Sequence, residues 1–425
     1  MSYSALKSGR SIPIGAIVAI TLAMSACGDS APAFSADAVV YEGARLITGD
    51  GATIENAVFV VDGDRFVTVG TSDEIDASSA ANRVDLTGKT VMPAIVNAHA
   101  HLASPRPQRT DQLQQWAYYG TGAVLSLGLD DGDVGFEMRN ESVAGLAQSR
   151  SAGRGITGEE PGRSEVPFWI TSEDAARSAV QELAAQEVDF VKIWVDDRGE
   201  QYTRLSPELY GAVIDEAHAN GLKVAAHIFR LEDAKGLLRA GIDAFAHGIR
   251  DMDVDDELME LWAERPDVVL IPNLPGPGVA LDLSWLSGTV PAERLAQMQA
   301  GQQDRPAAQA SFGIQARNLD RLNSAGVTIA FGTDGANPWT SHQEMEDMVR
   351  SGMTPAEVIV AATSTSAAVM GIDDIGTVGV GMRADFVVLD ANPLDDITNT
   401  RRISAVYLGG EEVDRDAVSA RLLGG

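Results

Sequence analysis

The sequence predicts an α/β fold, namely a (β/α)8 or TIM barrel with a small β-sandwich formed by the N- and C-terminal segments. Short apolar runs alternate with helical patterns through the middle of the chain, and eight such units are typical of a closed parallel barrel. Both ends of the chain instead contain short β-like runs separated by turn residues. A chain of 425 residues is long enough for one large barrel with an appendage.

The N-terminal end has the pattern of an export signal. Two basic residues precede a short apolar run at 12–24, and a small Ser-Ala pair leads to Cys27. A charged, an apolar and a small-residue region in this order are typical of a signal peptide, and the position of Cys27 resembles the lipidation site of bacterial lipoproteins. We therefore expect a signal peptide with a lipobox-like Cys27 over 1–27 and a polar tether over 28–37.

This interpretation predicts where the protein acts. We expect export to the periplasm or cell envelope, with a lipid anchor at Cys27 as the only attachment to a membrane. A plain exported protein, an uncleaved anchor and a cytoplasmic enzyme with a misread N-terminus are the alternatives. The apolar run is too short for a comfortable membrane span.

The predicted β-sandwich is divided between the two ends of the chain. Its first part is 38–92, where runs rich in Val, Phe, Ile and Thr alternate with turns such as Asp62-Gly63. Its second part is 371–425, where two similar runs are separated by turn residues. Strands from both ends are expected to meet in this one small unit.

The predicted barrel occupies 93–370, with its first strand beginning slightly earlier. Two long connections rich in Gly and Pro, 131–165 and 274–312, interrupt the alternation and are expected to form loops over the active face. The eight predicted strands are 91–102, 120–128, 154–158, 189–195, 222–229, 243–249, 268–274 and 327–335.

Three of the predicted helices have clear start signals. Thr171 with Asp174 three residues later is a variant of the capping box. Ser206-Pro207 places proline at a first helical position. Thr354, followed by proline and then Glu357, is expected to cap a final helix that continues to about residue 370.

Charge and cysteine content exclude several classes of function. The chain has 32 Lys plus Arg against 61 Asp plus Glu, a formal charge of -29. Such a surface repels nucleic-acid phosphates, so we expect no nucleic-acid partner. The single cysteine excludes an intrachain disulfide and a zinc site built from several thiolates. We expect a small-molecule substrate, and a homo-oligomer is possible.

Four of the six histidines lie at the ends of predicted barrel strands. His99 and His101 are two residues apart, so on a strand their imidazoles point the same way. His227 and His247 end two further apolar runs. Barrels place their active sites at these strand ends, and neutral imidazole binds zinc and related divalent ions. The four side chains therefore indicate a metal site, although each alone could be a packing residue.

Lys192 and Asp334 complete the candidate site. Lys192 lies within an apolar strand, where burial lowers the pKa of an amine and makes its neutral form available. A neutral amine can add carbon dioxide to form a carbamate, an anionic ligand able to bridge two metals. Asp334 ends the eighth strand and can bind metal or accept a proton from metal-bound water. The alternatives are an ion pair of Lys192 with Asp196 or Asp334, and a turn carboxylate at Asp334.

This set of residues resembles the metal-dependent amidohydrolase superfamily, in particular its imidazolonepropionase-like and prolidase-like branch. The HxH pair, the strand-four lysine, the two later histidines and the strand-eight aspartate match its motif, and residues 354–397 resemble its closing segment. The resemblance covers roughly 38–415. Asn97 stands where many members have aspartate, and no aromatic hydroxyl closely follows His227.

The resemblance implies a role for each position. His99, His101 and Asp334 would hold one metal, and His227 and His247 would hold a second. Lys192, as its carbamate, would bridge the two divalent ions, for which zinc is the expected metal. Asp334 would act as general base and proton donor, with His247 hydrogen-bonded to it or to the substrate.

The expected function is hydrolysis of a C–N amide bond, in a dipeptide or an N-acyl amino acid, by attack of a metal-bound hydroxide. Ester, lactone or phosphotriester hydrolysis at the same metal centre is an alternative, as is a non-catalytic, lipid-tethered binding protein. Arg230 and His342 are candidates for binding a substrate carboxylate, and Trp194 for lining the pocket.

Overall fold

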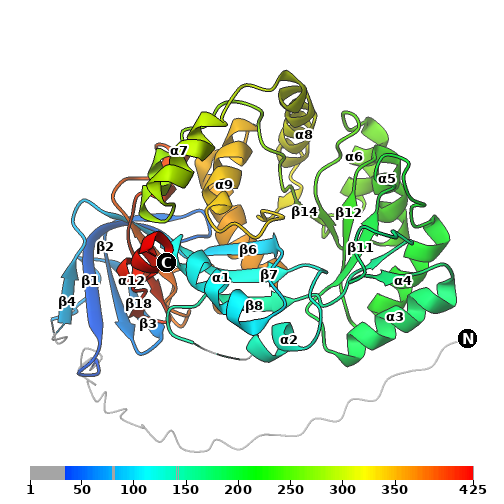
Figure 1. Cartoon of the computed structure of the whole chain (residues 1–425). Helices are drawn as coiled ribbons and strands as arrows, with labels where there is room; N and C mark the ends of the chain where they lie inside the picture. The colour runs from blue at the N-terminus through cyan, green and yellow to red at the C-terminus, as the bar shows by residue number, and fades with distance from the viewer. Residues whose placement is uncertain (1–33, 79–81, 140, 142, 425) are drawn as a thin grey trace, which may run out of the picture. The chain divides into compact units, whose positions relative to one another are not determined.

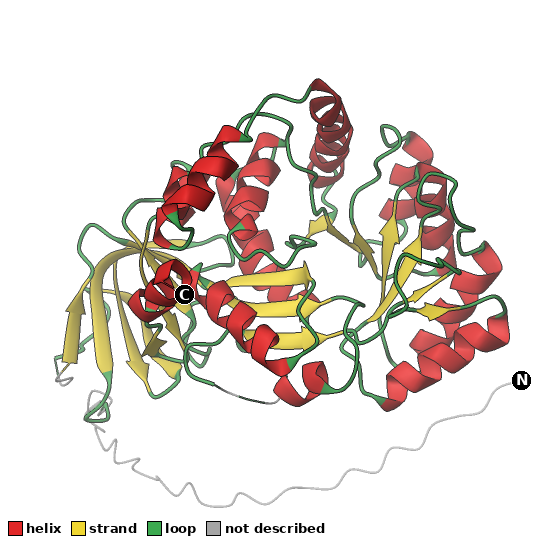
Figure 2. Cartoon of the chain, viewed as in Figure 1, coloured by secondary structure: helices red, strands yellow, loops and turns green. Residues whose placement is uncertain are grey.

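The computed structural model describes residues 34–78, 82–139, 141 and 143–424. The predicted signal peptide, Cys27 and most of the tether lie outside the described residues. None of the helices in the described ranges has both the length and the apolar character needed to cross a membrane. Figures 1 and 2 show a strand-rich unit next to a larger part in which strands and helices alternate.

Strands from both ends of the chain form one eight-stranded mixed sheet. Its order is β18-β17-β16-β5-β1-β2-β3, with β4 paired to β1. Strand β16 pairs antiparallel with β5, so a C-terminal strand is hydrogen-bonded to an N-terminal one. The strands are β1 Val39–Ile47, β2 Thr53–Asp62, β3 Arg65–Thr71, β4 Asn82–Asp85, β5 Thr90–Pro93, β16 Phe386–Leu389, β17 Ile403–Leu408 and β18 Glu411–Glu412.

This sheet is strongly curved around an aromatic core. Phe66 on β3 and Phe386 on β16 belong to strands separated by three others, yet their ring centroids are 5.7 Å apart. Tyr41 and Phe59 stack between them at 5.0 Å. Adjacent strands are about 4.8 Å apart, so this contact requires the sheet to bend back on itself. The two chain ends are therefore joined in one unit, as a single hydrogen-bonded sheet.

The middle of the chain contains parallel strands in two groups. Strands β6-β7-β8 form one, and β10-β9-β11-β12-β13-β14-β15 form the other. Strands β11 and β12 are buried along their whole length, as expected for parallel strands covered on both faces. The bounds are β6 Ile95–Ala100, β7 Thr121–Ser126, β8 Gln148–Ser151, β9 Ile156–Thr157, β10 Phe168–Trp169, β11 Val191–Val195, β12 Val224–Ile228, β13 Ala244–Ala246, β14 Val269–Ile271 and β15 Thr328–Ile329.

Backbone hydrogen bonds connect the first of these strands to the segment after β15. The Ala98 N–H donates to Phe331 O at 2.9 Å, and an isolated parallel bridge joins Ala100 to Gly335. The N–H groups of Thr333 and Asp334 both donate to His99 O. Segments more than 230 residues apart in sequence are thus held side by side where the metal site is expected.

The third predicted strand differs from the structure. Only Ile156 and Thr157 of 154–158 are in a strand, and an additional strand, β8, precedes them. The sequence of β8 is QSRS, which lacks the apolar residues on which the prediction depended. Its backbone nevertheless continues the parallel ladder beside β7.

The helices follow the predicted alternation, with small shifts at their ends. Helix α3 is capped by Ser172 rather than Thr171, whereas Ser206 caps α4 and Thr354 forms a capping box with Glu357 at α10, as predicted. The helices are α1 Arg106–Tyr118, α2 Val134–Met138, α3 Glu173–Ala185, α4 Pro207–Ala219, α5 Leu231–Ala240, α6 Asp256–Ala263, α7 Ala292–Ala300, α8 Pro306–Ser324, α9 Thr340–Arg350, α10 Pro355–Val360, α11 Ser366–Val369 and α12 Arg415–Gly424.

The two long connections contain structure of their own. The first includes α2, β8 and β9, and the second includes the 3-10 helix Ser284–Gly288, all of α7 and the start of α8. Leu283 and Leu286 of the second connection pack against Tyr119 in a small separate core, with Trp285 at its margin. This connection is therefore anchored to the end of α1 and is more than a loop.

Candidate metal centre

His99 and His101 are presented by the carboxyl end of β6. His99 is fully buried at the end of an entirely buried strand, and the centroids of the two rings are 5.4 Å apart. His99 Nδ1 lies 2.7 Å from Asn273 Oδ1. An amide oxygen only accepts, so Nδ1 carries the hydrogen and Nε2 keeps its lone pair for a ligand.

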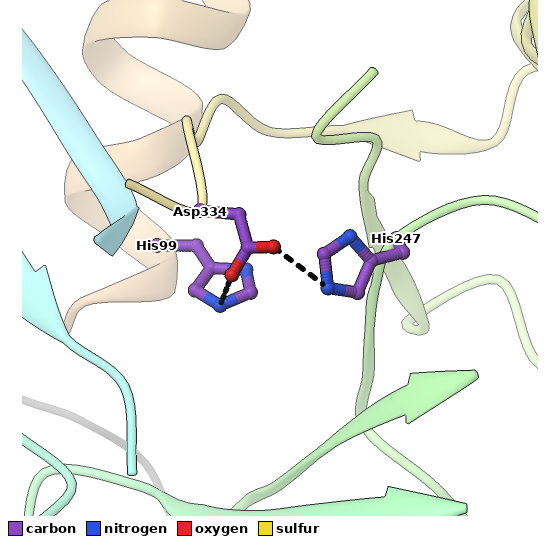
Figure 3. A group of neighbouring side chains, drawn as sticks. All are labelled: His99, His247 and Asp334. Carbon is purple, nitrogen blue, oxygen red and sulfur yellow. Dashed lines mark ion pairs between the residues drawn. The ribbon is translucent and has the colours of Figure 1, made fainter. Parts of the chain in front are cut away.

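Asp334 lies at the centre of the cluster, as Figure 3 shows for three of its members. Its Oδ1 is 3.1 Å from His99 Nε2 and 3.0 Å from His101 Nε2, and its Oδ2 is 3.4 Å from His247 Nε2. The Asp334 side chain is 39% exposed, while the imidazoles of His99 and His247 are buried. The carboxylate therefore remains accessible to a small molecule.

His227 and His247 come from the neighbouring strands β12 and β13. Their ring centroids are 4.6 Å apart, and the His99 and His247 centroids are 5.3 Å apart. His227 Nε2 lies 2.8 Å from Asp196 Oδ2 and 2.9 Å from Arg198 Nη1. His227 thus belongs to the same cluster of rings but is also in contact with the loop after β11.

Lys192 on β11 is fully buried, and its Nζ has no hydrogen-bond partner among the described residues. It lies 5.5 Å from the centroid of the Trp194 ring. Neither Asp196 nor Asp334 forms an ion pair with it within the described part of the chain; Asp196 instead pairs with Arg198 and His227. Burial lowers the pKa of Lys192 to about 7, against the opposing effect of Asp334.

The electrostatics of the site favour neutral imidazoles around an ionised carboxylate. Burial lowers the pKa of His99 to about 4 and holds the pKa values of His227 and His247 well below their usual range. Burial opposes ionisation of Asp334, but the neighbouring imidazoles outweigh it and lower the pKa of its carboxyl. These are the protonation states in which imidazole and carboxylate bind metals.

These side chains fit a divalent metal site. One ligand atom from each of His99, His247 and Asp334 lies within 4.8 Å of the other two. His99 Nε2, His101 Nδ1 and Lys192 Nζ are buried without a hydrogen bond in the described structure, and buried polar atoms normally have a partner. Imidazole nitrogens with a carboxylate are a donor set suited to zinc and related ions.

The three residues expected to bind substrate have different surroundings in the structure. Trp194 is buried beside Lys192. Arg230 Nη2 donates to Asp197 Oδ2 at 2.7 Å, in an ion pair within the protein. His342 is not placed to contact substrate, because it is buried and both of its ring nitrogens have partners, Thr400 Oγ1 and Tyr119 O. Its expected role is therefore corrected to packing of α9 in the core.

Three residues at the site were not identified from the sequence. Asn273 contacts His99, Arg198 contacts His227, and Arg250 lies three residues after His247. Asn273 ends the seventh predicted strand in the same way that the histidines end theirs, which was an available signal. Nothing in the local sequence marks Arg198 or Arg250, because both follow the strands within loops.

Comparison with known proteins identifies the family of the chain. Residues 163–413, more than half of the chain, match the sequence model of the amidohydrolase family. The imidazolonepropionase of Deinococcus radiodurans is 27% identical over 394 residues, covering 86% of this chain and 94% of the relative. The ochratoxinase of Aspergillus niger is 23% identical over 434 residues, covering 88% of this chain and 86% of the relative.

Solved structures show the same fold. The crystal structure of a candidate prolidase from Bifidobacterium longum superposes with a TM-score of 0.74 at 27% identity, covering 91% of this chain and 99% of that one. The fold shared with such neighbours is a TIM barrel with α/β content. The chain belongs to the amidohydrolase family, in its imidazolonepropionase-like and prolidase-like branch, and is an enzyme that hydrolyses C–N bonds.

Proposed function

We propose that this enzyme cleaves the amide bond of a dipeptide or an N-acyl amino acid with two divalent metal ions, zinc being the expected metal. The observation that carries the proposal is the convergence of His99, His101, His247 and Asp334. Lys192 nearby is fully buried and has no hydrogen-bond partner in the described part of the chain. The prolidase-like neighbours and the imidazolonepropionase relatives support an amide as the bond cleaved.

We assign the ligands as the resemblance to the amidohydrolase superfamily implies. His99, His101 and Asp334 would hold one ion, and His227 and His247 the other. Lys192, whose pKa of about 7 leaves much of the amine neutral at neutral pH, would attack carbon dioxide. A nitrogen–carbon bond forms and a proton is lost, which gives a carbamate with oxygen atoms for both ions.

The metals, when bound, polarise the substrate carbonyl and lower the pKa of water toward neutrality. The chain's own residues move the proton. Asp334 is ionised and partly exposed, so it can accept a proton from the attacking water and then donate it to the leaving amine. His247 Nε2 faces Asp334 Oδ2 at 3.4 Å, where it can orient this carboxylate or hydrogen-bond to the substrate oxygen.

The test is substitution of the lysine. In Lys192→Ala we expect the two-metal content and amide hydrolysis to be lost, because the variant lacks the amine that would form the carbamate. Lys223→Ala is a matched control, since Lys223 is exposed and directly precedes the neighbouring strand β12. Metal analysis should accompany a hydrolysis screen over dipeptides and N-acyl amino acids. A Lys192→Ala protein with full activity and full metal content would refute the assignment.

The same screen separates the alternatives. If turnover were confined to esters, lactones or phosphotriesters, the proposed metal centre would still hold but the proposed amide bond would be wrong. A protein with almost no metal that retains a tightly bound ligand would indicate a binding function.

We further propose the wider architecture predicted from the sequence. The eight barrel strands over 93–370 would close around the metal centre, and 38–92 with 371–425 would form the small β-sandwich. The mature protein would be exported and anchored by lipid at Cys27, which labelling of cells with radioactive palmitate would test, with Cys27→Ala as the unlabelled control. Homo-oligomerisation also stays a prediction.

A further inference from the structure

Arg250 is a half-buried cation that follows the strand of His247, and the described residues include no acidic partner for it. It follows β13 in the loop that begins with His247, and its backbone N–H donates to Phe229 O at 2.9 Å. The guanidinium Nε and Nη2 are buried and make no hydrogen bond within the described ranges. Among the described carboxylates, none forms an ion pair with Arg250.

The nearby acids are already engaged. Asp196 pairs with Arg198 at 2.8 Å and contacts His227 at 2.8 Å. Asp334 contacts the imidazoles of the metal centre. Asp251, next in the chain, accepts the Leu231 N–H at 3.0 Å. None of these acids is therefore paired directly with the Arg250 guanidinium in the described structure.

Arg250 is nevertheless tied to the site through the backbone, because the Phe229 carbonyl that accepts its N–H lies two residues after His227. After burial itself, its guanidinium is the largest influence lowering the pKa values of His227 and His247. Asp334 and Asp196 in turn are the charges that most favour the protonated form of Arg250. A guanidinium stays charged in proteins, and its two buried N–H groups cost free energy while they have no acceptor. An anion brought by a ligand would remove this cost.

We propose that Arg250 binds a carboxylate of the substrate and so selects amides that carry one. This inference rests on the proposed function and names a residue for its substrate class. A guanidinium with free Nε and Nη2 groups can bind a carboxylate through two parallel hydrogen bonds. Arg230 and Arg198 are less suited, because each is already paired with a carboxylate of the chain.

The loop also offers an apolar contact beside Arg250. Phe229, whose carbonyl accepts the Arg250 N–H, is 39% exposed, which is unusual for a large apolar side chain in this protein. A ligand with an apolar group next to its carboxylate could use both features. N-acetyl-L-phenylalanine and N-(2-phenylethyl)acetamide are therefore a suitable pair of probes, because they differ only by the carboxylate.

The test compares binding of the two probes to the purified full chain with its metals, by titration calorimetry, together with metal content. We expect the carboxylate probe to bind at least about tenfold more tightly than the neutral one. In Arg250→Met this preference should fall to about twofold or less, and Arg250→Lys should retain part of it. Arg317→Met is the control and should keep the preference, since Arg317 pairs with Asp253 of the same loop at an exposed position.

Three results would overturn the proposal. One is a wild-type protein that shows no preference, including one that binds neither probe. Another is an Arg250→Met protein that keeps the preference. A third is loss of metal together with equal loss of both probes in Arg250→Met, which would mean that Arg250 neutralises a metal ligand instead. Failure of the proposed function is separate, because it would appear as a wild-type chain without metal and without amide hydrolysis.

Discussion

Several residues of the metal centre have backbone conformations that residues other than glycine normally avoid. His247, Asn273 and Asp334 have φ values of 103°, 43° and 53°. For residues other than glycine, positive φ is uncommon and costs on the order of 1–3 kcal/mol. Such conformations persist only where the surrounding structure fixes them, as the two hydrogen bonds from Thr333 and Asp334 to His99 O do here. The strained backbone positions are therefore residues of the metal centre itself.

Asn273 is the residue whose removal tests this arrangement most directly. Its Oδ1 fixes the tautomer and orientation of His99, and groups that support a metal ligand in this way typically contribute about 10–100-fold to metal affinity. We expect Asn273→Gly, which tolerates the positive φ, to weaken zinc binding by this factor. Competition with a chromogenic chelator would measure it.

The control variant at position 273 keeps an acceptor for the hydrogen bond from His99. Asn273→Asp retains an oxygen that can accept from His99 Nδ1, so zinc affinity should stay within a few fold of the wild type. If Asn273→Gly bound zinc as tightly as the parent protein, Asn273 would have no positioning role.

Between elements, the space for Lys192 depends on a glycine in the segment that follows β7, a strand of the other parallel group. Gly128 lies just after β7 with φ of 95°. A Cβ added there would lie 2.6 Å from Lys192 Cγ and 2.8 Å from the Trp194 ring. The close approach of Gly128 to the side chains of Lys192 and Trp194 therefore requires the absence of a side chain at position 128.

Gly128→Ala should consequently displace Lys192 and lower both metal content and amide hydrolysis. Gly132→Ala is a matched control, because Gly132 has a similar φ of 77° but a Cβ there would have no neighbour within 4 Å. Both variants should lose about 1 kcal/mol of stability from the backbone. Metal analysis and urea unfolding of the two proteins separate the effects, and equal metal content in both would contradict the packing argument.

At the scale of the whole molecule, the sequence was informative where the side chains of the metal site lie at the ends of strands. His99, His227 and Asp334 each end or directly follow an apolar run, so periodicity alone predicted their common location. Asn273 supports His99 through a contact between segments distant in sequence, at 2.7 Å. Periodicity carries no information about such contacts.

The errors have a similar physical origin. His342 was expected near the substrate because it follows strand eight, but α9 turns it into a core with Thr400 and Tyr119. Strand β8 was missed because its side chains are polar while its backbone completes the ladder. In both cases the packing of distant segments determined the structure, and the local sequence pattern carries no information about that packing.

The final prediction concerns the sheet that strands from both ends of the chain form together. The Phe386 ring contacts Tyr41, Phe59, Phe66 and Tyr407, so one C-terminal side chain fills the core of strands from the N-terminal segment. Phe386→Ala leaves a cavity there and should cost about 3–5 kcal/mol in the free energy of unfolding. Val380→Ala, at a site 67% exposed in the same C-terminal segment, should change it by less than about 0.5 kcal/mol. Urea denaturation followed by circular dichroism would measure both, and a loss below about 1 kcal/mol for Phe386→Ala would mean that the terminal sheet does not fold together with the rest of the enzyme.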